Sequence, residues 1–253
     1  MRLFARRSPD ITAVVTGASS GIGAATARRL SELGFDVVLG GRRLDRVREV
    51  AAECGGRALR LDVTEDASVA AFVAEVGDCR VLVNNAGGAL GLRAISDADL
   101  GEWRRMYDTN VLGTVRMTKS LLPQLEATGG HVVVVGSIAG SEVYPGGGGY
   151  TAAKHAEDAL TRTLRLELLG RPVRVTQVMP GMVNTEFSLV RLGSQDAADR
   201  VYEGMTPLTA GDVADVIGYV VTRPPHVCID TVRVLPLEQA TALQTHRRPQ
   251  PGA

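Results

Sequence analysis

A tyrosine and a lysine stand four residues apart in the stretch YTAAK, from Tyr150 to Lys154. On a helix, positions i and i+4 share one face, so the phenol and the ammonium would be neighbours. A free phenol has a pKa of about 10, too high for a base at neutral pH, and a nearby ammonium lowers it. The pair predicts a general acid/base that works near neutral pH. An ordinary exposed pair on a helix is the alternative.

Two further polar residues fit the same chemistry. Ser137 follows an apolar run at the carboxyl end of a predicted strand, the edge at which parallel sheets bind ligands. Its hydroxyl could donate a hydrogen bond to a carbonyl oxygen on which charge develops. Asn110 falls inside a predicted helix, where Asn is unfavourable. A water chain to Lys154 would give its amide partners, and a satisfied core Asn is the alternative.

A glycine-rich turn, TGASSGIG, lies between the first predicted strand and the first predicted helix. Glycines let the backbone approach a ligand closely, and the start of a helix offers unpaired N–H groups and a positive dipole to a pyrophosphate. The turn predicts a nucleotide site, with a plain tight turn as the alternative. Its candidate cofactor-binding residues are Gly17, Ser19, Ser20, Gly21, Ile22 and Gly23.

The end of the second predicted strand favours NADP(H) over NAD. No carboxylate stands there to accept hydrogen bonds from a ribose 2′-hydroxyl; Arg42 and Arg43 follow instead. A guanidinium can hold a 2′-phosphate with two hydrogen bonds, although two solvated arginines are the alternative. Asp62 and Val63, after the third predicted strand, could hold the adenine edge and ring, or Asp62 could simply cap the next turn.

Four consecutive glycines, residues 146–149, precede the helix that carries the Tyr–Lys pair. They could let the chain turn sharply beside a flat cofactor and substrate. A flexible surface loop explains them equally well, and both interpretations stay open at this point.

The elements that must position these residues alternate along the chain. Short apolar runs predict strands, and longer runs with helical periodicity predict helices. Alternating strands and helices predict an α/β fold, a doubly wound parallel sheet with helices on both faces. The predicted strands are 11–17, 36–41, 58–63, 81–87, 131–137, 173–181 and 229–236; the predicted helices are 21–33, 44–54, 65–76, 97–125, 150–169 and 212–222, and 184–206 is predicted to be irregular.

Composition excludes several classes of protein. The 253 residues carry 28 basic and 28 acidic side chains, so no electrostatic attraction to nucleic acid or to a membrane surface is expected. No apolar run is long enough to span a bilayer. The three cysteines form no C-x-x-C and no cluster with histidine, so no metal site is expected. We expect a cytoplasmic protein of one domain, residues 1–253, with flexible tails at 1–10 and 240–253.

Taken together, TGASSGIG, the NNAG of residues 84–87, Asn110, Ser137, the Tyr150/Lys154 pair and MPGMVNTEF resemble the short-chain dehydrogenase/reductase family over nearly the whole chain. The resemblance implies a single Rossmann-type domain with a seven-stranded parallel sheet, and hydride transfer between a nicotinamide and a carbonyl or alcohol carbon. It implies that Tyr150 is the general acid/base, that Ser137 orients the substrate oxygen, that Lys154 assists the tyrosine and holds the nicotinamide ribose, and that Asn110 supports a relay water. It adds as cofactor-binding residues Asn84, Ala86, Gly87, Pro180, Gly181, Val183 and Thr185.

Arg42 places the chain in the NADP-preferring branch, and its last third resembles reductases of 3-hydroxy acids such as serine 3-dehydrogenases. Arg191, in an expected lid, could meet a substrate carboxylate or simply be solvated, and solvation is the expectation. Family members pair their long helices into dimers and tetramers, so a homo-oligomer, most simply a homotetramer, is expected. The residues expected to line the substrate pocket are Ser137, Val143, Tyr144, Met182 and Phe187.

The sequence thus predicts an NADP(H)-dependent oxidoreductase that interconverts a small-molecule ketone or aldehyde with its alcohol. A 3-oxoacyl-carrier-protein reductase is the alternative within this class; it would favour a basic docking patch, to which Arg104, Arg105 and Arg116 could contribute. A non-catalytic NADP(H)-sensing regulator is the alternative from another class. The intact Ser137, Tyr150 and Lys154 argue against a sensor, which has no need of a proton relay.

Overall fold

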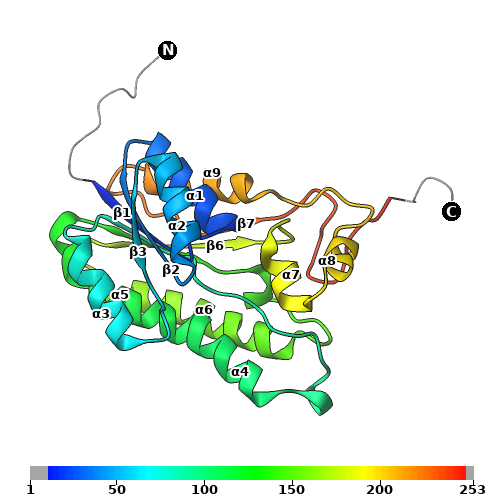
Figure 1. Cartoon of the computed structure of the whole chain (residues 1–253). Coiled ribbons are helices and arrows are strands. Elements are labelled where there is room, and N and C mark those ends of the chain that lie inside the picture. Colours follow the sequence, from blue (N-terminus) through cyan, green and yellow to red (C-terminus); the bar gives the residue numbers. More distant parts are fainter. Residues whose placement is uncertain (1–10, 249–253) are drawn as a thin grey trace.

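The computed structural model describes residues 11–248, which are built around one seven-stranded sheet (Figure 1). All six strand pairings are parallel, and the strand order is β3-β2-β1-β4-β5-β6-β7. The predicted doubly wound, single-domain sheet is therefore confirmed. The strands are β1 (Thr12–Thr16), β2 (Asp36–Gly41), β3 (Arg57–Arg60), β4 (Val81–Asn84), β5 (His131–Val135), β6 (Arg174–Pro180) and β7 (Thr231–Val234).

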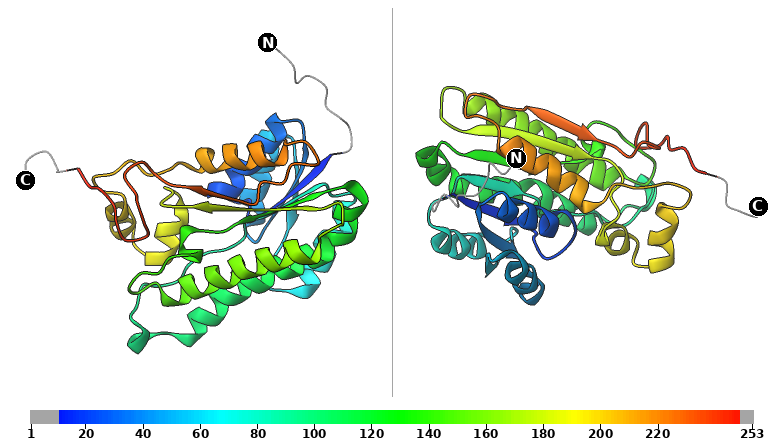
Figure 2. Two further views of the ribbon diagram at one scale, coloured as in Figure 1. Left: turned by 180° about the vertical axis from the view of Figure 1, so that it is seen from behind. Right: turned by 90° about the horizontal axis from the view of Figure 1, so that it is seen from above.

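Each strand of the sheet centre is apolar on both sides, because helices cover both faces (Figures 1 and 2). In β1, Ala13 and Val15 join the core beneath α1 (Gly21–Glu32), α2 (Leu44–Cys54) and α9 (Ala210–Val221). Val14 points the other way, into the core beneath α3 (Asp66–Val76), α5 (Gly113–Thr128) and the carboxyl half of α6 (Gly148–Glu167). This sandwich fixes the strand ends that carry the candidate site.

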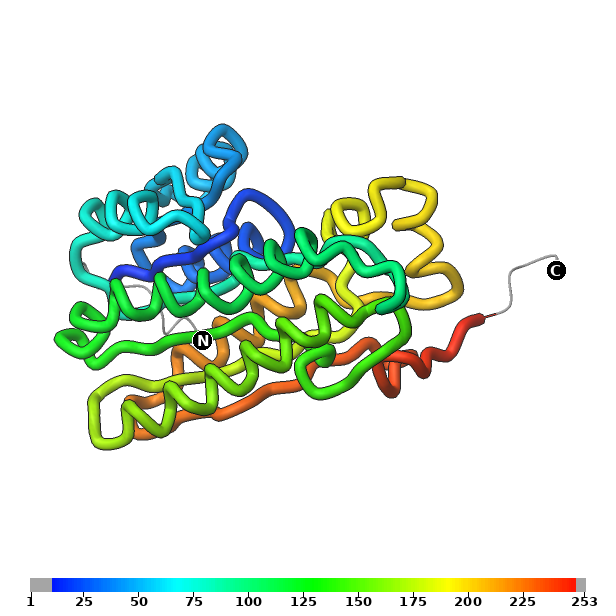
Figure 3. Tube along the Cα trace, turned by 90° about the horizontal axis from the view of Figure 1, so that it is seen from below, coloured from blue at the N-terminus to red at the C-terminus, as the bar shows by residue number. Residues whose placement is uncertain are grey.

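The helix predicted over 97–125 is divided. A 3-10 turn, η1 (Ile95–Asp97), precedes α4 (Leu100–Tyr107), which Asp99 caps, and a π-helical segment, η2 (Asp108–Leu112), joins α4 to α5. The rod of α4, η2 and α5 runs alongside α6 (Figure 3). Within residues 11–248, no helix combines the length and the apolar character needed to cross a membrane.

The region predicted as irregular, 184–206, contains two short helices. They are α7 (Glu186–Leu192) and α8 (Gln195–Val201), each of seven residues and each capped at its start, by Thr185 and by Ser194. Two turns are too few for an apolar periodicity to be visible in the sequence, which explains the wrong prediction.

The segment after β7 also differs from the expected tail. Residues 236–248 pack back onto the chain: the Met182 amide donates to Oε1 of Gln239 at 2.8 Å, and the Arg248 amide donates to the Gly204 carbonyl oxygen at 2.7 Å. The expected tail 1–10 lies outside the described residues, as do residues 249–253 of the expected tail 240–253.

Candidate functional site

A cavity of about 730 Å³ extends along the carboxyl edge of the sheet and beneath α7. It collects most of the predicted site residues from segments far apart in the sequence: Gly17, Ser19, Ser20, Gly21, Ile22, Arg42, Arg43, Asp62, Val63, Ala86, Gly87, Ser137, Tyr144, Tyr150, Lys154, Pro180, Gly181, Met182, Val183, Thr185 and Phe187. Four predicted residues do not line it: Gly23, Asn84, Asn110 and Val143. Val143 is 66% exposed, so the expected place for it in the substrate pocket is not supported by the structure.

The Tyr–Lys pair sits in the first half of α6, with both side chains buried. The Lys154 ammonium donates to the Val135 carbonyl oxygen at 3.1 Å and to Oε2 of Glu157 at 2.7 Å. Burial disfavours the charged ammonium, but the Glu157 carboxylate outweighs it and raises the pKa of Lys154. Glu157 thus keeps a positive charge on the helix face that carries Tyr150.

Ser137 is positioned by the end of β5, where the chain enters a 3-10 turn, η3 (Ile138–Gly140). Its hydroxyl oxygen accepts a hydrogen bond from the Ala139 amide at 3.1 Å. The hydroxyl proton remains available to a ligand in the cavity, as a donor to a substrate oxygen requires.

Asn110 is fully buried in η2 and fastens that segment to the loop after β4. Its amide nitrogen donates to the carbonyl oxygens of Gly88, at 3.0 Å, and of Met106, at 2.7 Å, and its Oδ1 accepts from the Gly88 amide at 3.2 Å. The side chain is therefore satisfied by backbone, which matches the core-Asn alternative. The relay water near Lys154 stays a prediction.

The phosphate end of the cavity is formed by the turn before α1. Gly17 and Gly21 have φ of +66° and +54°, a left-handed backbone that favours glycine. Ser20 caps α1 without a side-chain hydrogen bond to its first turn, so the N–H groups at the start of α1 remain available to a ligand. This helix start, open to the cavity, fits a pyrophosphate.

The two adjacent arginines after β2 differ in their partners. Arg43 donates to the hydroxyls of Ser19, at 3.0 Å, and Ser20, at 2.7 Å, and pairs with Glu186 at 2.8 Å. Hydrogen bonds, first of all from Arg43, hold the pKa of Glu186 below its usual range. Arg42 is exposed, lines the cavity, and forms no ion pair with another residue of 11–248.

The residues expected near the adenine, Asp62 and Val63, and the buried Asn84 have different surroundings. Asp62 accepts hydrogen bonds from the amide and the hydroxyl of Thr64, at 3.0 and 2.7 Å, so it caps the next turn as the alternative interpretation held. Burial opposes ionisation of Asp62, but those hydrogen bonds outweigh it and lower its pKa. Val63 lines the cavity beside it. Asn84 is buried away from the cavity and donates to the Thr118 hydroxyl at 3.0 Å.

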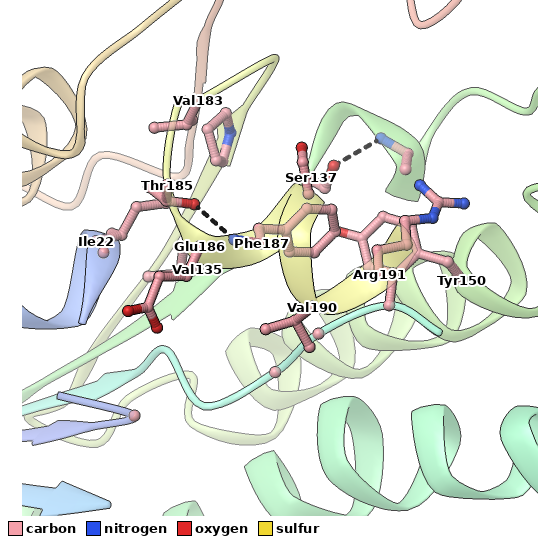
Figure 4. Close-up of a pocket in the computed structure, with 18 of the residues that line it drawn as sticks. Ile22, Val135, Ser137, Tyr150, Val183, Thr185, Glu186, Phe187, Val190 and Arg191 are labelled. Carbon is pink, nitrogen blue, oxygen red and sulfur yellow. Dashed lines mark hydrogen bonds between the residues drawn. The ribbon is translucent and has the colours of Figure 1, made fainter. Parts of the chain in front are cut away.

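At the substrate end, α7 lays two side chains against the catalytic candidate Tyr150 (Figure 4). The Phe187 ring centroid is 5.5 Å from that of Tyr150, and the Arg191 guanidinium carbon is 5.5 Å from it. Arg191 is half-buried; it donates to the Gly91 carbonyl oxygen at 3.0 Å and to the Tyr144 hydroxyl at 2.9 Å. Its half-burial and these two hydrogen bonds differ from the expectation of a solvated lid arginine, and among residues 11–248 it has no carboxylate partner.

Three of the four glycines, residues 147–149, have a packing explanation that neither interpretation anticipated, whereas Gly146 has a φ of +75°, which fits a sharp turn. A Cβ on Gly149 would lie 2.5 Å from Cε of Met106 and 2.9 Å from the Trp103 ring, and one on Gly148 would lie 3.0 Å from that ring. A Cβ on Gly147 would overlap the Tyr144 ring. The glycines allow the start of α6 to pack tightly against α4 and against Tyr144 at the cavity wall.

Three residues of the site were missed by sequence reasoning. Glu157 lies three residues after Lys154, a spacing that could have revealed it. Gln239 holds the backbone after β6, and Glu186 pairs with arginines far away in the chain; neither has a sequence signal.

Arg116, a candidate for a basic patch that would dock an acyl-carrier protein, is instead held at 2.8 Å by both Asp66 and Asp108.

Comparison with known proteins decides the family. The family model described as short chain dehydrogenase matches residues 11–191. The chain belongs to the short-chain dehydrogenase/reductase family. It is 59% identical to an uncharacterised oxidoreductase of Mycobacterium tuberculosis, over 94% of this chain and 95% of that protein. It is 44% identical to a sulfoacetaldehyde reductase of Chromohalobacter salexigens, over 89% of this chain and 94% of that one.

Its fold also matches a solved structure described as the closed form of serine dehydrogenase complexed with NADP+, with a TM-score of 0.89, 38% identity, and coverage of 94% of this chain and 100% of that one. This short-chain dehydrogenase/reductase is therefore an oxidoreductase of alcohol and carbonyl groups, and its cofactor is NADP(H), as the sequence predicted. The helix start open at α1 and the exposed Arg42 fit a dinucleotide with a 2′-phosphate.

Proposed function

We propose that this enzyme interconverts a small carbonyl acid and the corresponding hydroxy acid, with Tyr150 as the general acid/base and Arg191 as the receptor for the acid group. The observation that carries the proposal is the half-buried guanidinium of Arg191, 5.5 Å from the Tyr150 ring and without a carboxylate partner among residues 11–248. A cation in such a setting is stabilised by an anionic ligand. The names of two relatives, a sulfoacetaldehyde reductase and a serine dehydrogenase, support an acidic substrate.

Different side chains carry out the separate steps of carbonyl reduction. NADPH, when bound, supplies the hydride that reaches the carbonyl carbon. The Ser137 hydroxyl donates to the carbonyl oxygen, and the Tyr150 hydroxyl delivers a proton to that oxygen as the C–H bond forms. Lys154, kept cationic by Glu157, stabilises the phenolate that Tyr150 becomes. In the oxidative direction the same phenolate removes the proton of the alcohol.

Arg191 suits the acid group because its geometry is already fixed. Two of its donors hold the Gly91 carbonyl oxygen and the Tyr144 hydroxyl, which orient the guanidinium plane against the aromatic rings. The remaining N–H groups can hold a carboxylate or sulfonate oxygen. An acid group held there would place a carbonyl one or two carbons away near Tyr150 and Ser137.

The experiment compares NADPH-dependent reduction of a 3-oxo acid with that of its methyl ester. The unmodified enzyme should prefer the acid, and Arg191→Gln should lose about 10- to 100-fold in kcat/KM for the acid while the ester changes little, as expected for one hydrogen bond to a charged group. Arg200→Gln, an exposed arginine on the neighbouring α8, is the control. Equal use of acid and ester by the unmodified enzyme would exclude the anion receptor.

Tyr150→Phe tests the acid/base separately. It should abolish turnover of both acid and ester but leave NADPH binding intact, because the phenol is assigned to proton transfer. Reduction at the original rate would show that another group moves the proton.

We also propose a cytoplasmic homo-oligomer built through the α4–α6 side, where Tyr107 and Leu112 are 45% and 39% exposed. A sedimentation mass of one 26.7 kDa chain would reject the oligomer.

A further inference from the structure

The first residue of the lid helix α7 is bound by two arginines from the opposite side of the cavity. One carboxylate oxygen of Glu186 accepts from Arg43 at 2.8 Å, and the other accepts from Arg46 at 2.5 Å. The arginines lie at the start of α2, after β2, whereas Glu186 follows β6. These contacts join segments 140 and 143 residues apart in the sequence, across the edge of the sheet at which the cofactor binds.

The ion pairs pass beside the phosphate end of the cavity. Arg43 also donates to the hydroxyls of Ser19 and Ser20, which immediately precede α1. Arg43, Ser19, Ser20 and Glu186 all line the cavity. In Figure 4, Glu186 lies on the side of Ile22 in α1, and the rest of α7 extends toward Tyr150. A pyrophosphate at the start of α1 would therefore have the Glu186–Arg43 contact at its outer side.

The partners of Arg42 and Arg43 indicate different tasks. Arg43 already makes three side-chain contacts, two to the serines and one to Glu186. Arg42, the preceding residue, forms no ion pair with another residue of 11–248 and is exposed at the cavity. Arg42 is thus available to a 2′-phosphate, whereas Arg43 is occupied with the lid.

We propose that Glu186, Arg43 and Arg46 form a clasp that holds α7 closed over the cofactor and slows its dissociation. Glu186 is a positioning residue in this proposal, since it acts through the lid. The clasp contacts the protein on both sides of the pyrophosphate, which NADPH and NADH share. It should therefore retain both dinucleotides equally, while Arg42 discriminates between them. The proposal does not depend on the identity of the substrate.

The same contacts could serve the opposite purpose. A carboxylate held by Arg43 and Arg46 could occupy the place of the 2′-phosphate and compete with it. Removing Glu186 would then slow the dissociation of NADPH and leave NADH unchanged. The three contacts of Arg43 favour the clasp, because Arg43 is fixed to the Ser19–Ser20 turn as well as to the lid. The experiment distinguishes the two.

The test measures the dissociation rates of NADPH and NADH by stopped-flow fluorescence, with excess NADP+ as the displacing ligand. Glu186→Gln and Arg46→Ala should each speed the dissociation of both cofactors about three- to tenfold, the size expected for one or two half-exposed ion pairs. The double variant should speed cofactor dissociation by less than the product of the two single accelerations, since both substitutions remove the same Glu186–Arg46 ion pair. High salt should reduce the difference in dissociation rate between the variants and the unmodified enzyme, because it screens the ion pairs.

Two control variants separate the clasp from general effects of charge. Arg48→Ala removes an arginine of α2 whose partner is Asp45 on the same helix, at 3.0 Å, and should leave both rates unchanged. Arg42→Ala should speed the dissociation of NADPH alone. The clasp is refuted if Glu186→Gln changes neither rate, or if it slows the dissociation of NADPH only, the behaviour of a competitor. These binding rates are independent of catalysis, so they stand even if the proposed substrate class fails.

Discussion

The buried ion pair of Lys154 and Glu157, on the helix that carries Tyr150, allows a quantitative prediction about stability. Lys154 and Glu157 are joined at 2.7 Å, and their side chains are only 6% and 2% exposed. Replacing Glu157 with Gln keeps the volume of the side chain but removes its negative charge, so the ammonium stays in a buried site beside neutral acceptors, the Val135 carbonyl oxygen and the new amide oxygen. The structure therefore predicts that Glu157→Gln lowers the free energy of unfolding substantially.

The expected size follows from the burial of both groups. Removing one partner of a buried ion pair costs roughly 3–5 kcal/mol, because the other charge stays in a medium that cannot solvate it. The free energy of unfolding of a domain is about 5–15 kcal/mol, so this single substitution would remove a large part of it. Replacing both charges at once, Lys154→Met with Glu157→Gln, removes the buried charge itself. The double variant should recover to within about 2 kcal/mol of the unmodified protein.

Urea unfolding at neutral pH, followed by circular dichroism, measures these differences. Arg48→Gln, which breaks an exposed pair with the same i, i+3 spacing, provides the control and should cost less than about 1 kcal/mol. The reasoning is refuted if Glu157→Gln costs no more than Arg48→Gln. It is also refuted if the double variant loses the sum of the two single losses, since the charges would then act independently.

Two further predictions concern the core. Burial lowers the pKa of His131 to about 3, and its Nδ1 has no hydrogen-bond partner among residues 11–248, so a second proton would be unsatisfied. The unfolded chain takes up that proton at about pH 6.5. The free energy of unfolding should therefore fall by up to about 1.4 kcal/mol per pH unit as the pH drops from 6.5 toward 3. Urea unfolding at a series of pH values should show a shallower fall for His131→Gln. Gly149→Ala should cost about 1–3 kcal/mol through overlap with the rigid Trp103 ring. The control Gly211→Ala, with its nearest neighbour at 3.5 Å, should leave the melting temperature nearly unchanged.

Features encoded by local spacing were the predictable part of this molecule. The alternation of apolar runs and helical periodicity predicted all seven strands, and the signal was clearest in central strands such as β4 and β5, which are buried on both faces and apolar throughout most of their length. The i, i+4 spacing of Tyr150 and Lys154 predicted a shared helix face, and the structure places both on α6. The turn at Gly17 and Gly21 was predicted because only a glycine-rich backbone takes up those φ angles readily.

Features created by contacts between distant segments were not predictable. The spacing of Lys154 and Glu157 could have indicated an ion pair, but only the fold shows that this face of the helix is buried. The partners of Glu186 lie 140 and 143 residues away, and no local pattern joins them. The glycines of residues 146–149 suggested a turn or a loop, whereas Gly148 and Gly149 lie in α6 and pack against Trp103 and Met106 of α4.

The position of α7 connects the two ends of the site. This helix of seven residues carries Glu186 at its first position and Arg191 one residue before its end, separated by a rise of about 7.5 Å. One end is held by arginines beside the phosphate turn, and the other lies over Tyr150 with Phe187 between them. A lid that is held closed at its cofactor end therefore also presents Arg191 to the substrate. If both proposals hold, the acid receptor is complete only when α7 is in place, because the clasp and the receptor belong to one short helix.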